Sequence, residues 1–342
     1  MNTTTLSILN QLPDGLIEAE ATALHQILPN PTLIHISGSR SQPIFVSVLL
    51  HGNEHTGFLA IQALLKKYQN KPLPRSLSIF FGNVQAAKLA QRRIDTGPDY
   101  NRIWPGTEQS ESPESHIAQQ IVDDMQQRKV FISIDIHNNT GLNPHFACIN
   151  SLDPNFLHLA NLFSRLTVYF LRPKGVQSAA FSKICPAVTL ECGKPGVKYG
   201  VEHALDYLDT CLHLNNLADH PPAAHDIDLF HTVALVKIRD HISFSFDNDS
   251  VDLKLTTNLE RMNFTEINAG TTFGIVQPDA SMPLISRDES GTDNTDNYFT
   301  VHNQQLVSRK AVMPSMLTLN EAVIRQDCLC YLMEKMEVPK KN

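Results

Sequence analysis

Short β-rich runs alternate with stretches of helical periodicity from residue 43 to about residue 216, a pattern typical of an α/β domain. A nearly continuous apolar run over residues 44–50 predicts a buried strand, and apolar side chains then recur at helical spacing over residues 56–68. Ser112 supplies a capping side chain directly before a proline and a glutamate, which predicts a helix that runs to about residue 128. The same patterns predict a helix over residues 201–214 and further strands over residues 77–81, 130–136, 145–150, 167–171 and 187–190.

The pattern changes after residues 219–225, a proline-containing segment poor in structure formers, and we place a domain boundary there. Beyond it, apolar runs without intervening helices predict successive strands over residues 230–238, 242–246 and 251–255. Residues 287–297 are polar and predict a loop. The sequence therefore predicts an α/β domain over residues 1–218 and a smaller β-rich domain over residues 226–342.

The composition describes an ordinary globular chain. Its 342 residues, of which 42% are hydrophobic and 18% charged, are enough to bury a sizeable core. The formal net charge of -7 argues against a nucleic-acid partner, because binding phosphates requires a basic surface. No stretch approaches the roughly 18 to 20 continuous apolar residues of a membrane span. Residues 1–15 lack the basic start and apolar run of a secretory signal, so we expect neither a membrane partner nor export.

The six cysteines are scattered, and only Cys328 and Cys330 are close together, which matches neither a zinc knuckle nor a disulfide framework. Reduced thiols in a cytoplasmic protein are the simplest interpretation, and no cysteine lies in the setting of a nucleophile. A serine hydrolase is also disfavoured, because the chain has no G-x-S-x-G turn. The sequence leaves the oligomeric state open and is compatible with a homo-oligomer.

The strongest chemical signal is the pair His51 and Glu54, which lie three residues apart where the strand over residues 44–50 ends. Ligands bind at strand ends in α/β sheets, and histidine and carboxylate are both good zinc ligands. His137 ends another predicted strand and is the obvious third ligand, leaving one coordination position open as catalytic zinc sites require. Asp135 shares a strand face with His137, and we expect it to orient the imidazole ring.

A second interpretation is open for the same segment. His51, Glu54 and His55 also fit the H-x-x-E-H pattern, in which both histidines bind zinc and the glutamate is the base. That pattern requires a helix, whereas a glycine and an asparagine follow His51 directly after a strand. We therefore favour the strand-end arrangement. Most of the 15 histidines must be ordinary residues, and we expect His55 and His145 to be structural.

Four segments stand in a recognisable order. They begin at His51 (His-Gly-Asn-Glu-His-Thr-Gly), at Arg92 (Arg-Arg-Ile-Asp, followed from Asp99 by Asp-Tyr-Asn-Arg), at Asp135 (Asp-Ile-His-Asn-Asn-Thr) and at Leu190 (Leu-Glu-Cys-Gly). Together they resemble the succinylglutamate desuccinylase and aspartoacylase family, which is related to the zinc metallocarboxypeptidases, and the set is more specific than any one segment. The resemblance implies an α/β fold: a carboxypeptidase-like (phosphorylase/hydrolase-like) mixed sheet flanked by helices, with a smaller C-terminal β-rich domain that shapes the substrate entrance.

The resemblance also implies one Zn²⁺ per chain, with His51, Glu54 and His137 as its ligands and Glu191 as the base that activates the attacking water. The chemistry agrees, because a metal lowers the pKa of water and a nearby carboxylate can take the proton and return it to the leaving amine. Taken alone, Glu191 would read as a solvated acid at a strand end. The presence of the metal-ligand motif in the same chain favours a catalytic role for Glu191.

Three further residues acquire roles from the resemblance. Arg92 matches the arginine that stabilises the developing oxyanion, with Arg93 as its competitor for that role. Asn101 and Arg102 match the pair that grips the carboxylate of a small-molecule substrate. A guanidinium suits both tasks because its fixed donors pair with oxygens in a plane. Exposed charges at a helix end are the alternative reading of Arg92 and Arg93.

Two departures from the family bear on the substrate. Phe181 stands where the acylases carry a further arginine, ten positions before the catalytic glutamate. A second substrate carboxylate therefore lacks its partner unless Arg172, Lys174 or Lys183 replaces it. The family's carboxy-terminal tyrosine that contacts substrate has no clear match, and Tyr298 is our candidate for substrate binding from its place in the predicted loop.

Three functions compete at this point. The first is a zinc-dependent hydrolase that cleaves the amide bond of an N-acyl amino acid or a similar small amide bearing a carboxylate. The second is a carboxypeptidase-like enzyme acting on peptides or amino-acid conjugates, which the apolar Phe181 favours. The third is a non-catalytic metal-binding protein, although the ligands, base and arginines all remain. A site of two histidines and one carboxylate also accepts other divalent metals.

Overall fold

The chain is built around a large mixed sheet, in which the computed structural model, describing residues 4–278 and 281–339, has 12 strands. One short strand, β13 (Leu284–Arg287), pairs with β9 (Asp228–Ile238) but lies outside the row formed by the other strands. In spatial order the other strands are β1 (Ser7–Leu9), β2 (Thr32–Ile36), β4 (Leu77–Phe81), β3 (Ile44–Val48), β5 (Ile132–His137), β8 (Ala187–Glu191), β6 (Phe146–Ile149), β7 (Leu166–Tyr169), β9 (Asp228–Ile238), β17 (Cys330–Lys335) and β16 (Met313–Ser315).

The middle of this sheet is parallel. Strands β4, β3, β5 and β8 all run in one direction, so their carboxyl ends lie at one edge of the sheet. Their side chains are buried on both faces, which explains why the sequence shows almost continuous apolar runs there. Ligands bind at this edge in α/β proteins, and the chemically informative motifs all follow these strands.

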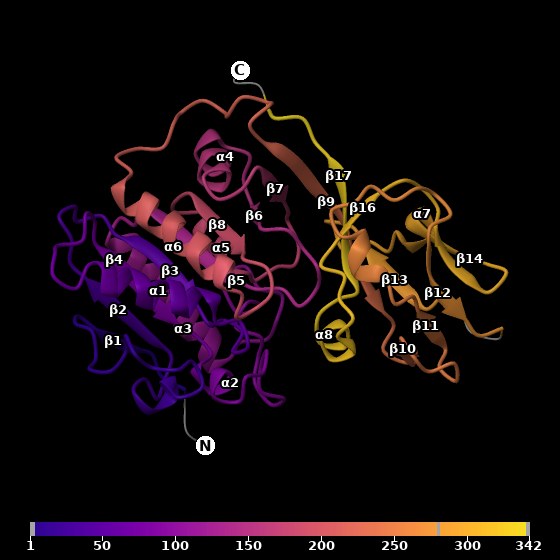
Figure 1. Ribbon diagram of the computed structural model, residues 1–342, viewed down its shortest axis with the longest axis horizontal. Coiled ribbons are helices and arrows are strands. Elements are labelled where there is room, and N and C mark those ends of the chain that lie inside the picture. Colours follow the sequence, from indigo (N-terminus) through magenta and orange to yellow (C-terminus); the bar gives the residue numbers. More distant parts are fainter. Residues whose placement is uncertain (1–3, 279–280, 340–342) are drawn as a thin grey trace.

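Helices flank the sheet. Two of them, α1 (Thr56–Lys67) and α6 (Lys198–His213), pack side by side across it (Figure 1). Two short 3₁₀ turns, η1 (Leu24–Gln26) and η2 (Leu259–Met262), join loops. The helices are α1 (Thr56–Lys67), α2 (Val84–Lys88), α3 (Pro113–Gln127), α4 (Pro154–Asn161), α5 (Gln177–Phe181), α6 (Lys198–His213), α7 (Thr295–Tyr298) and α8 (Glu321–Gln326).

The local signals in the sequence account for two of these helices. The oxygen of Ser112 accepts a hydrogen bond from the backbone N–H of Ser115, and the Ser115 hydroxyl accepts one from the N–H of Ser112, so α3 begins with a capping box. Helix α1 buries Phe58, Ile61 and Leu64 against the sheet at the predicted spacing. The predicted α/β fold with a mixed sheet flanked by helices is confirmed.

The β-rich half continues the same sheet. Strand β9 pairs with β7 on one side and with β17 on the other, and both long strands run from the α/β half into the β-rich half (Figure 1). The predicted boundary at residues 219–225 falls in a segment without helix or strand. The division into residues 1–218 and 226–342 stays a prediction, and residues 1–3 and 340–342 lie outside the described part. The β-rich half adds a 5-stranded sheet of β10 (Phe244–Ser245), β11 (Leu253–Leu255), β12 (Thr272–Val276), β15 (Gln305–Ser308) and β14 (Phe299–His302).

One sequence prediction in this half was too broad. The loop expected over residues 287–297 is shorter, because β13 still includes Arg287 and α7 begins at Thr295. The hydroxyl of Thr295 donates to Asp293 and accepts from the N–H of Ser286, and these bonds hold the turn against β13. The polar sequence of residues 287–297 therefore does not indicate the helical turn that begins at Thr295, because tertiary contacts stabilise it.

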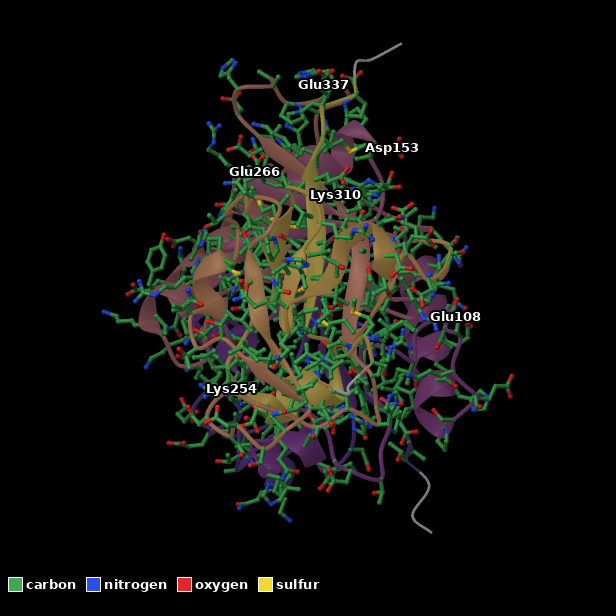
Figure 2. The ribbon with its side chains drawn as sticks, turned by 90° about the vertical axis from the view of Figure 1, so that its right-hand side faces the viewer. Glu108, Asp153, Lys254, Glu266, Lys310 and Glu337 are labelled. Atoms are coloured by element: carbon green, nitrogen blue, oxygen red, sulfur yellow. The ribbon has the colours of Figure 1, made fainter. Side chains whose placement is uncertain are left out.

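The outside of the molecule is charged. Figure 2 shows the molecule from the side of the β-rich half, and exposed acids such as Glu108 and Glu266 are labelled on its surface. Within residues 4–278 and 281–339, none of the helices combines the length and apolar character that crossing a bilayer requires.

Candidate active site

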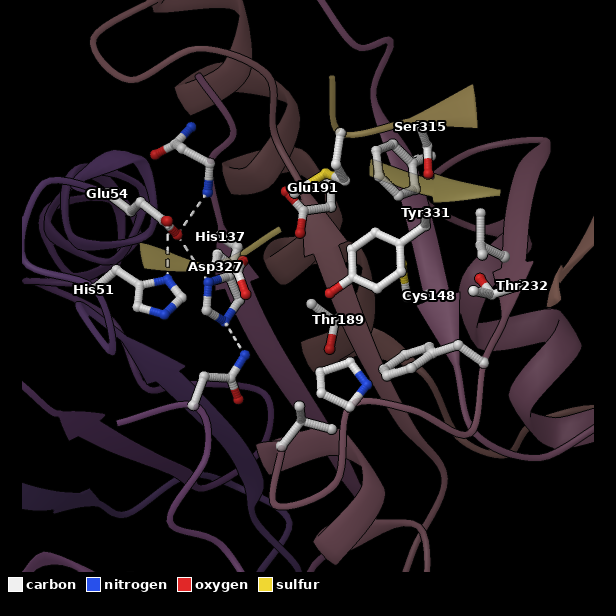
Figure 3. Close-up of a pocket in the computed structure, with 18 of the residues that line it drawn as sticks. His51, Glu54, His137, Cys148, Thr189, Glu191, Thr232, Ser315, Asp327 and Tyr331 are labelled. Atoms are coloured by element: carbon white, nitrogen blue, oxygen red, sulfur yellow. Dashed lines mark hydrogen bonds and ion pairs between the residues drawn. The ribbon is translucent and has the colours of Figure 1, made fainter. Parts of the chain in front are cut away.

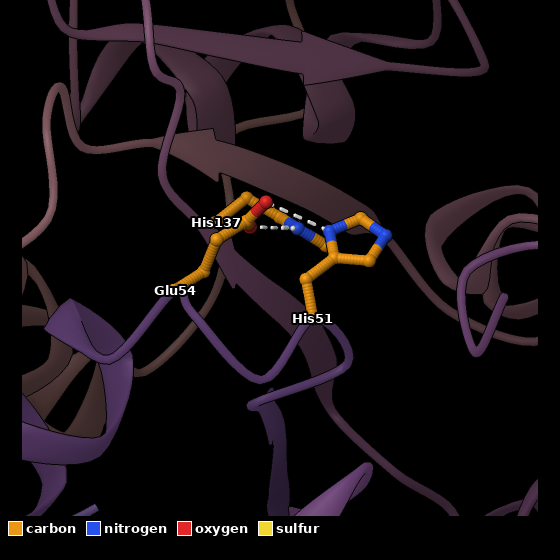
Figure 4. A group of neighbouring side chains, drawn as sticks. All are labelled: His51, Glu54 and His137. Atoms are coloured by element: carbon orange, nitrogen blue, oxygen red, sulfur yellow. Dashed lines mark hydrogen bonds and ion pairs between the residues drawn. The ribbon is translucent and has the colours of Figure 1, made fainter. Parts of the chain in front are cut away.

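Three side chains that are distant in the sequence meet at the carboxyl edge of the parallel strands. One donor atom from each of His51, Glu54 and His137 lies within 4.8 Å of the others, and all three residues are buried. The Nδ1 atom of His51 lies 2.9 Å from Glu54 Oε1, and the Nδ1 atom of His137 lies 2.8 Å from Glu54 Oε2 (Figure 4). The predicted trio therefore forms one compact group.

The backbone around His51 explains this arrangement. Strand β3 ends at Val48, and the chain then turns through Leu49, whose φ of 56° is left-handed. A side chain at Gly52 would place its Cβ 2.1 Å from the backbone nitrogen of Ala87, so only glycine allows this close approach to α2. Helix α1 begins only at Thr56.

The alternative helical H-x-x-E-H interpretation is wrong, because His51 and Glu54 precede the helix. His55 is the N-cap residue of α1, and its side chain makes no capping hydrogen bond. His145 also lies away from the group: its Nδ1 is 2.8 Å from the Nδ1 of His203, and the two rings stack.

The Nε2 atom of each imidazole, on the side of the ring away from Glu54, contacts an aspartate carboxylate. The Nε2 atom of His51 lies 3.0 Å from Asp99 Oδ1, and the Nε2 atom of His137 lies 2.8 Å from Asp135 Oδ2. Asp135 in turn accepts a 2.7 Å hydrogen bond from Ser47. With a proton on Nε2 donated to the carboxylate, each ring presents the lone pair of Nδ1 toward Glu54. Two imidazole nitrogens and a carboxylate fit a divalent metal of the zinc type.

The electrostatics of the group are strongly coupled. Burial alone would raise the pKa of Glu54, but the two histidines lower it far below its ordinary value. Burial would lower the pKa of His137, but Asp135 and Glu54 raise it well above its ordinary value. The carboxylates of Glu54 and Asp135 thus stabilise positive charge on His137. A metal ion bound at the same place can supply that charge instead of the histidine protons.

Glu191 is brought to the same site by the register of the sheet. It is the last residue of β8 and pairs with His137, the last residue of β5. The amide of Asn139 donates a 3.4 Å hydrogen bond to its carboxylate. Burial raises the pKa of Glu191 to about 7, although the nearby His137 opposes the rise. A carboxylate with this pKa can both accept and release a proton near neutral pH.

A cavity connects these groups (Figure 3). The metal-ligand candidates and Glu191 lie in its wall, as do Arg92, Asn101 and Arg102. The structure therefore brings together all the predicted site residues except Tyr298.

Arg93 is excluded from the role in which it competed with Arg92. Its guanidinium donates to the carbonyl oxygen of Gly97 and does not line this cavity.

The predicted substrate contact at Tyr298 is not supported by its position. Its ring is buried in the apolar core of the β-rich half, with the ammonium of Lys310 4.4 Å above it, and it is absent from the described cavity lining. Tyr331, on β17, projects into the cavity instead (Figure 3). The apolar run after Asp327 predicts a final strand and was the available signal. The sequence alone, however, does not pair that strand with β9.

The position of Phe181 is also settled by the structure. Its ring is fully buried and stacks on Phe45 with 4.5 Å between the ring centroids, outside the cavity lining. None of the three suggested replacement cations lines the cavity either. Arg172 pairs with Glu108, while Lys174 and Lys183 border other surface hollows.

We expect Phe181→Ala to destabilise the fold by about 3 to 5 kcal/mol, because it removes a large ring from a closely packed aromatic group. Phe181 also meets Trp104 edge-on at 5.9 Å, so both neighbours would border the void. Urea unfolding followed by tryptophan fluorescence measures the change, and the fully buried Trp104 is the chain's one tryptophan. A loss below about 1 kcal/mol would show that the surrounding core collapses into the space.

Comparison with known proteins agrees with this geometry. Residues 42–210 match a family model described as the succinylglutamate desuccinylase/aspartoacylase catalytic domain. Residues 42–210 of the chain belong to this family. The match includes every motif on which the resemblance was based, from His51 to Glu191. No curated protein matches the chain when sequences are compared.

Solved structures of similar proteins have the same fold. The succinylglutamate desuccinylase of Chromobacterium violaceum is 17% identical with a TM-score of 0.58, over 88% of this chain and 87% of that one. A succinylglutamate desuccinylase/aspartoacylase from Rhodobacter sphaeroides is 14% identical with a TM-score of 0.58, over 88% of each chain. Murine aminoacylase 3 is 17% identical with a TM-score of 0.54, over 89% of this chain and 99% of that one. The likeness extends through the β-rich half.

Proposed function

We propose that this chain is a zinc-dependent amidohydrolase that removes the acyl group from an N-acyl amino acid or a similar small amide bearing a carboxylate. The observation that carries the proposal is the convergence of His51, Glu54 and His137 in one cavity with Glu191. Membership of residues 42–210 in the family supports it. Relatives described as desuccinylases and an aminoacylase support an N-acyl amino acid as the substrate class.

His51, Glu54 and His137 would hold the metal. When bound there, zinc supplies a Lewis acid that polarises the scissile carbonyl and makes water more acidic. The three side chains leave space on the cavity side for substrate, because their other faces are occupied by Asp99, Asp135 and the backbone. The open side is what distinguishes a catalytic metal site from a structural one.

Glu191 would move the proton. In its ionised form it takes a proton from the attacking water, and in its protonated form it delivers that proton to the nitrogen of the leaving amine. Its raised pKa suits both steps, because neither protonation state is strongly disfavoured near neutral pH. Asn139 orients the carboxylate through its amide.

Arg92 and Arg102 would bind the substrate's oxygens. Arg92 lies 3.5 Å from Glu54 Oε1 and is therefore close to where an oxyanion would form. Arg102 lines the same cavity and would anchor the carboxylate. Asn101 is held in this part of the site by Gln177, whose backbone N–H donates to the side-chain oxygen of Asn101. Tyr331 takes the place that we assigned to Tyr298 in substrate binding.

The test is a substrate panel on metal-loaded protein. Acylated amino acids and short peptides of matched size are incubated with protein whose metal content has been measured, and the released amine is quantified. We expect hydrolysis of the acylated amino acids. Cleavage of peptides alone would favour a carboxypeptidase, and inactivity on both sets would favour a non-catalytic metal-binding protein.

The six cysteines are all free in the structure, which suits a reducing compartment, and we propose a cytoplasmic location. Fractionation of cells that produce the tagged protein tests this.

We expect Asp135→Asn to weaken zinc binding by about 10-fold to 100-fold. The carboxylate is completely buried, and its charge strengthens the hydrogen bond to His137 Nε2. Competition with a chelating dye measures the metal affinity. Asp123→Asn, on the exposed face of α3, is the matched control and should leave the affinity unchanged. Equal affinities for Asp135→Asn and the parent protein would contradict the role of Asp135.

A further inference from the structure

The cavity contains a carboxylate that belongs to the protein and occupies its arginines. Asp327 Oδ1 lies 2.8 Å from Arg102 Nη2, and its Oδ2 lies 3.1 Å from Arg92 Nη2. One carboxylate thus bridges the two guanidinium groups, with one oxygen on each. Asp327 follows α8 directly and reaches the catalytic half from the C-terminal part of the chain.

Asp327 changes the charge balance of the cavity. Its side chain is only 15% exposed, and burial alone would raise its pKa, but Arg92 and Arg102 lower the pKa below the ordinary value. Asp99 also approaches Arg92, with 3.3 Å between Oδ2 and Nη2. The two aspartates together offset both guanidinium charges, so the arginines offer a substrate carboxylate their remaining hydrogen-bond donors but no surplus positive charge.

The described cavity lining offers no other arginine or lysine. Away from the metal group its wall is mainly apolar, and the apolar side chains come from β6, from β7 and the loop that follows it, and from the turn after β16. These are Phe146, Val168, Phe170, Pro173, Val176 and Met316. An apolar substituent gains free energy by leaving water for such a wall, whereas a carboxylate there would lose its hydration without a partner.

We propose that Asp327 is a specificity-determining residue, and that the enzyme accepts N-acyl amino acids with one carboxylate and an apolar side chain while rejecting diacids. The inference rests on the proposed function and specifies its substrate class. The single carboxylate is received by the remaining donors of Arg102, and the apolar side chain lies against the wall formed around Phe146 and Val168. A second carboxylate meets the negative charge of Asp327.

The test compares N-acetylnorleucine with N-acetylglutamate, whose side chains are similar in length and differ in charge. We expect wild-type kcat/KM to favour N-acetylnorleucine by at least about tenfold, since unfavourable charge pairs in binding sites have effects of that size or larger. Asp327→Asn should shift the ratio toward N-acetylglutamate by at least about tenfold. Asp327→Glu keeps the charge and should retain the wild-type preference. Asp240→Asn, at an exposed position, is the matched control.

Two results would overturn the proposal: a wild-type preference for N-acetylglutamate, or an unchanged ratio in a folded Asp327→Asn variant. Thermal unfolding identifies a variant that does not fold. In that case, calorimetric titration of the metal-loaded wild-type protein with the same two compounds decides, because tighter binding of the diacid contradicts the proposal. The titration also separates the two hypotheses: selective binding of N-acetylnorleucine without hydrolysis would defeat the proposed function and leave the selectivity intact.

Discussion

Replacing His51 with alanine is expected to remove the metal from the protein and to reduce kcat/KM by at least about a thousandfold. Loss of a residue that merely orients a ligand costs about 10-fold to 100-fold in metal affinity, and loss of a ligand itself costs more. His51 supplies one of the two imidazole nitrogens, and the remaining pair, Glu54 and His137, leaves half of a tetrahedral shell to water. Elemental analysis of dialysed protein and steady-state kinetics measure the two effects.

His55→Ala is the matched control for this variant. His55 lies four residues further on, belongs to the same motif, and makes no capping hydrogen bond to α1. Its replacement should preserve both metal content and activity. Loss of metal from both variants would restore the helical H-x-x-E-H arrangement, in which both histidines are ligands. Metal kept by His51→Ala would contradict the geometry of the site. A thermal unfolding curve for each variant separates loss of metal from loss of fold.

The metal group could be predicted because its information is local. An apolar run in the sequence marks the strand that precedes His51 and the strands that end at His137 and Glu191. Because these strands are parallel, their carboxyl ends lie at one edge of the sheet. The catalytic role of Glu191, in contrast, came from the resemblance to the family, since the residue alone would be interpreted as a solvated acid at a strand end. The contact between Asp135 and the ring of His137 could be predicted from strand alternation alone.

The other side of the cavity could not be predicted in this way. Asp327 and Tyr331 reach it only because β17 pairs with β9, and β9 with β7. Such pairings depend on the whole topology, and nothing in the residues around position 327 indicates which strand they will join. The choice of Tyr298 failed for the same reason, because its polar neighbours suggested a loop while its ring packs into a core.

Two strands at one end of the large sheet were not predicted either. β1 has three residues, and β2, although buried, follows a stretch without clear periodicity. Their place in the sheet is secured by pairing, of β1 with β2 and of β2 with β4, rather than by propensity, which carries little weight in short segments. The continuation of the large sheet into the β-rich half has the same origin, since a sequence shows strands but not their partners.

Glu191→Gln is expected to lower kcat by about 10²-fold to 10⁴-fold while the protein keeps its metal. Glutamine has nearly the shape of glutamate and can still accept the hydrogen bond from Asn139, but it cannot take a proton from water. The KM should change little, because the carboxylate acts in proton transfer rather than in binding the substrate. Elemental analysis confirms the metal content, and steady-state kinetics give kcat and KM separately.

The pH profile adds a second readout that a merely structural role would not move. Glu191 serves as a base only when ionised, so wild-type kcat/KM should rise with pH through the pKa of this group. Burial places that pKa at about 7, and the positive charge of a bound metal favours the ionised form, so the acid limb should lie at or below about pH 7. Glu191→Gln should lose this limb, and Glu202→Gln, an exposed control on α6, should keep it. A metal-loaded Glu191→Gln protein with wild-type kcat and an unchanged acid limb would assign the proton transfer to another group.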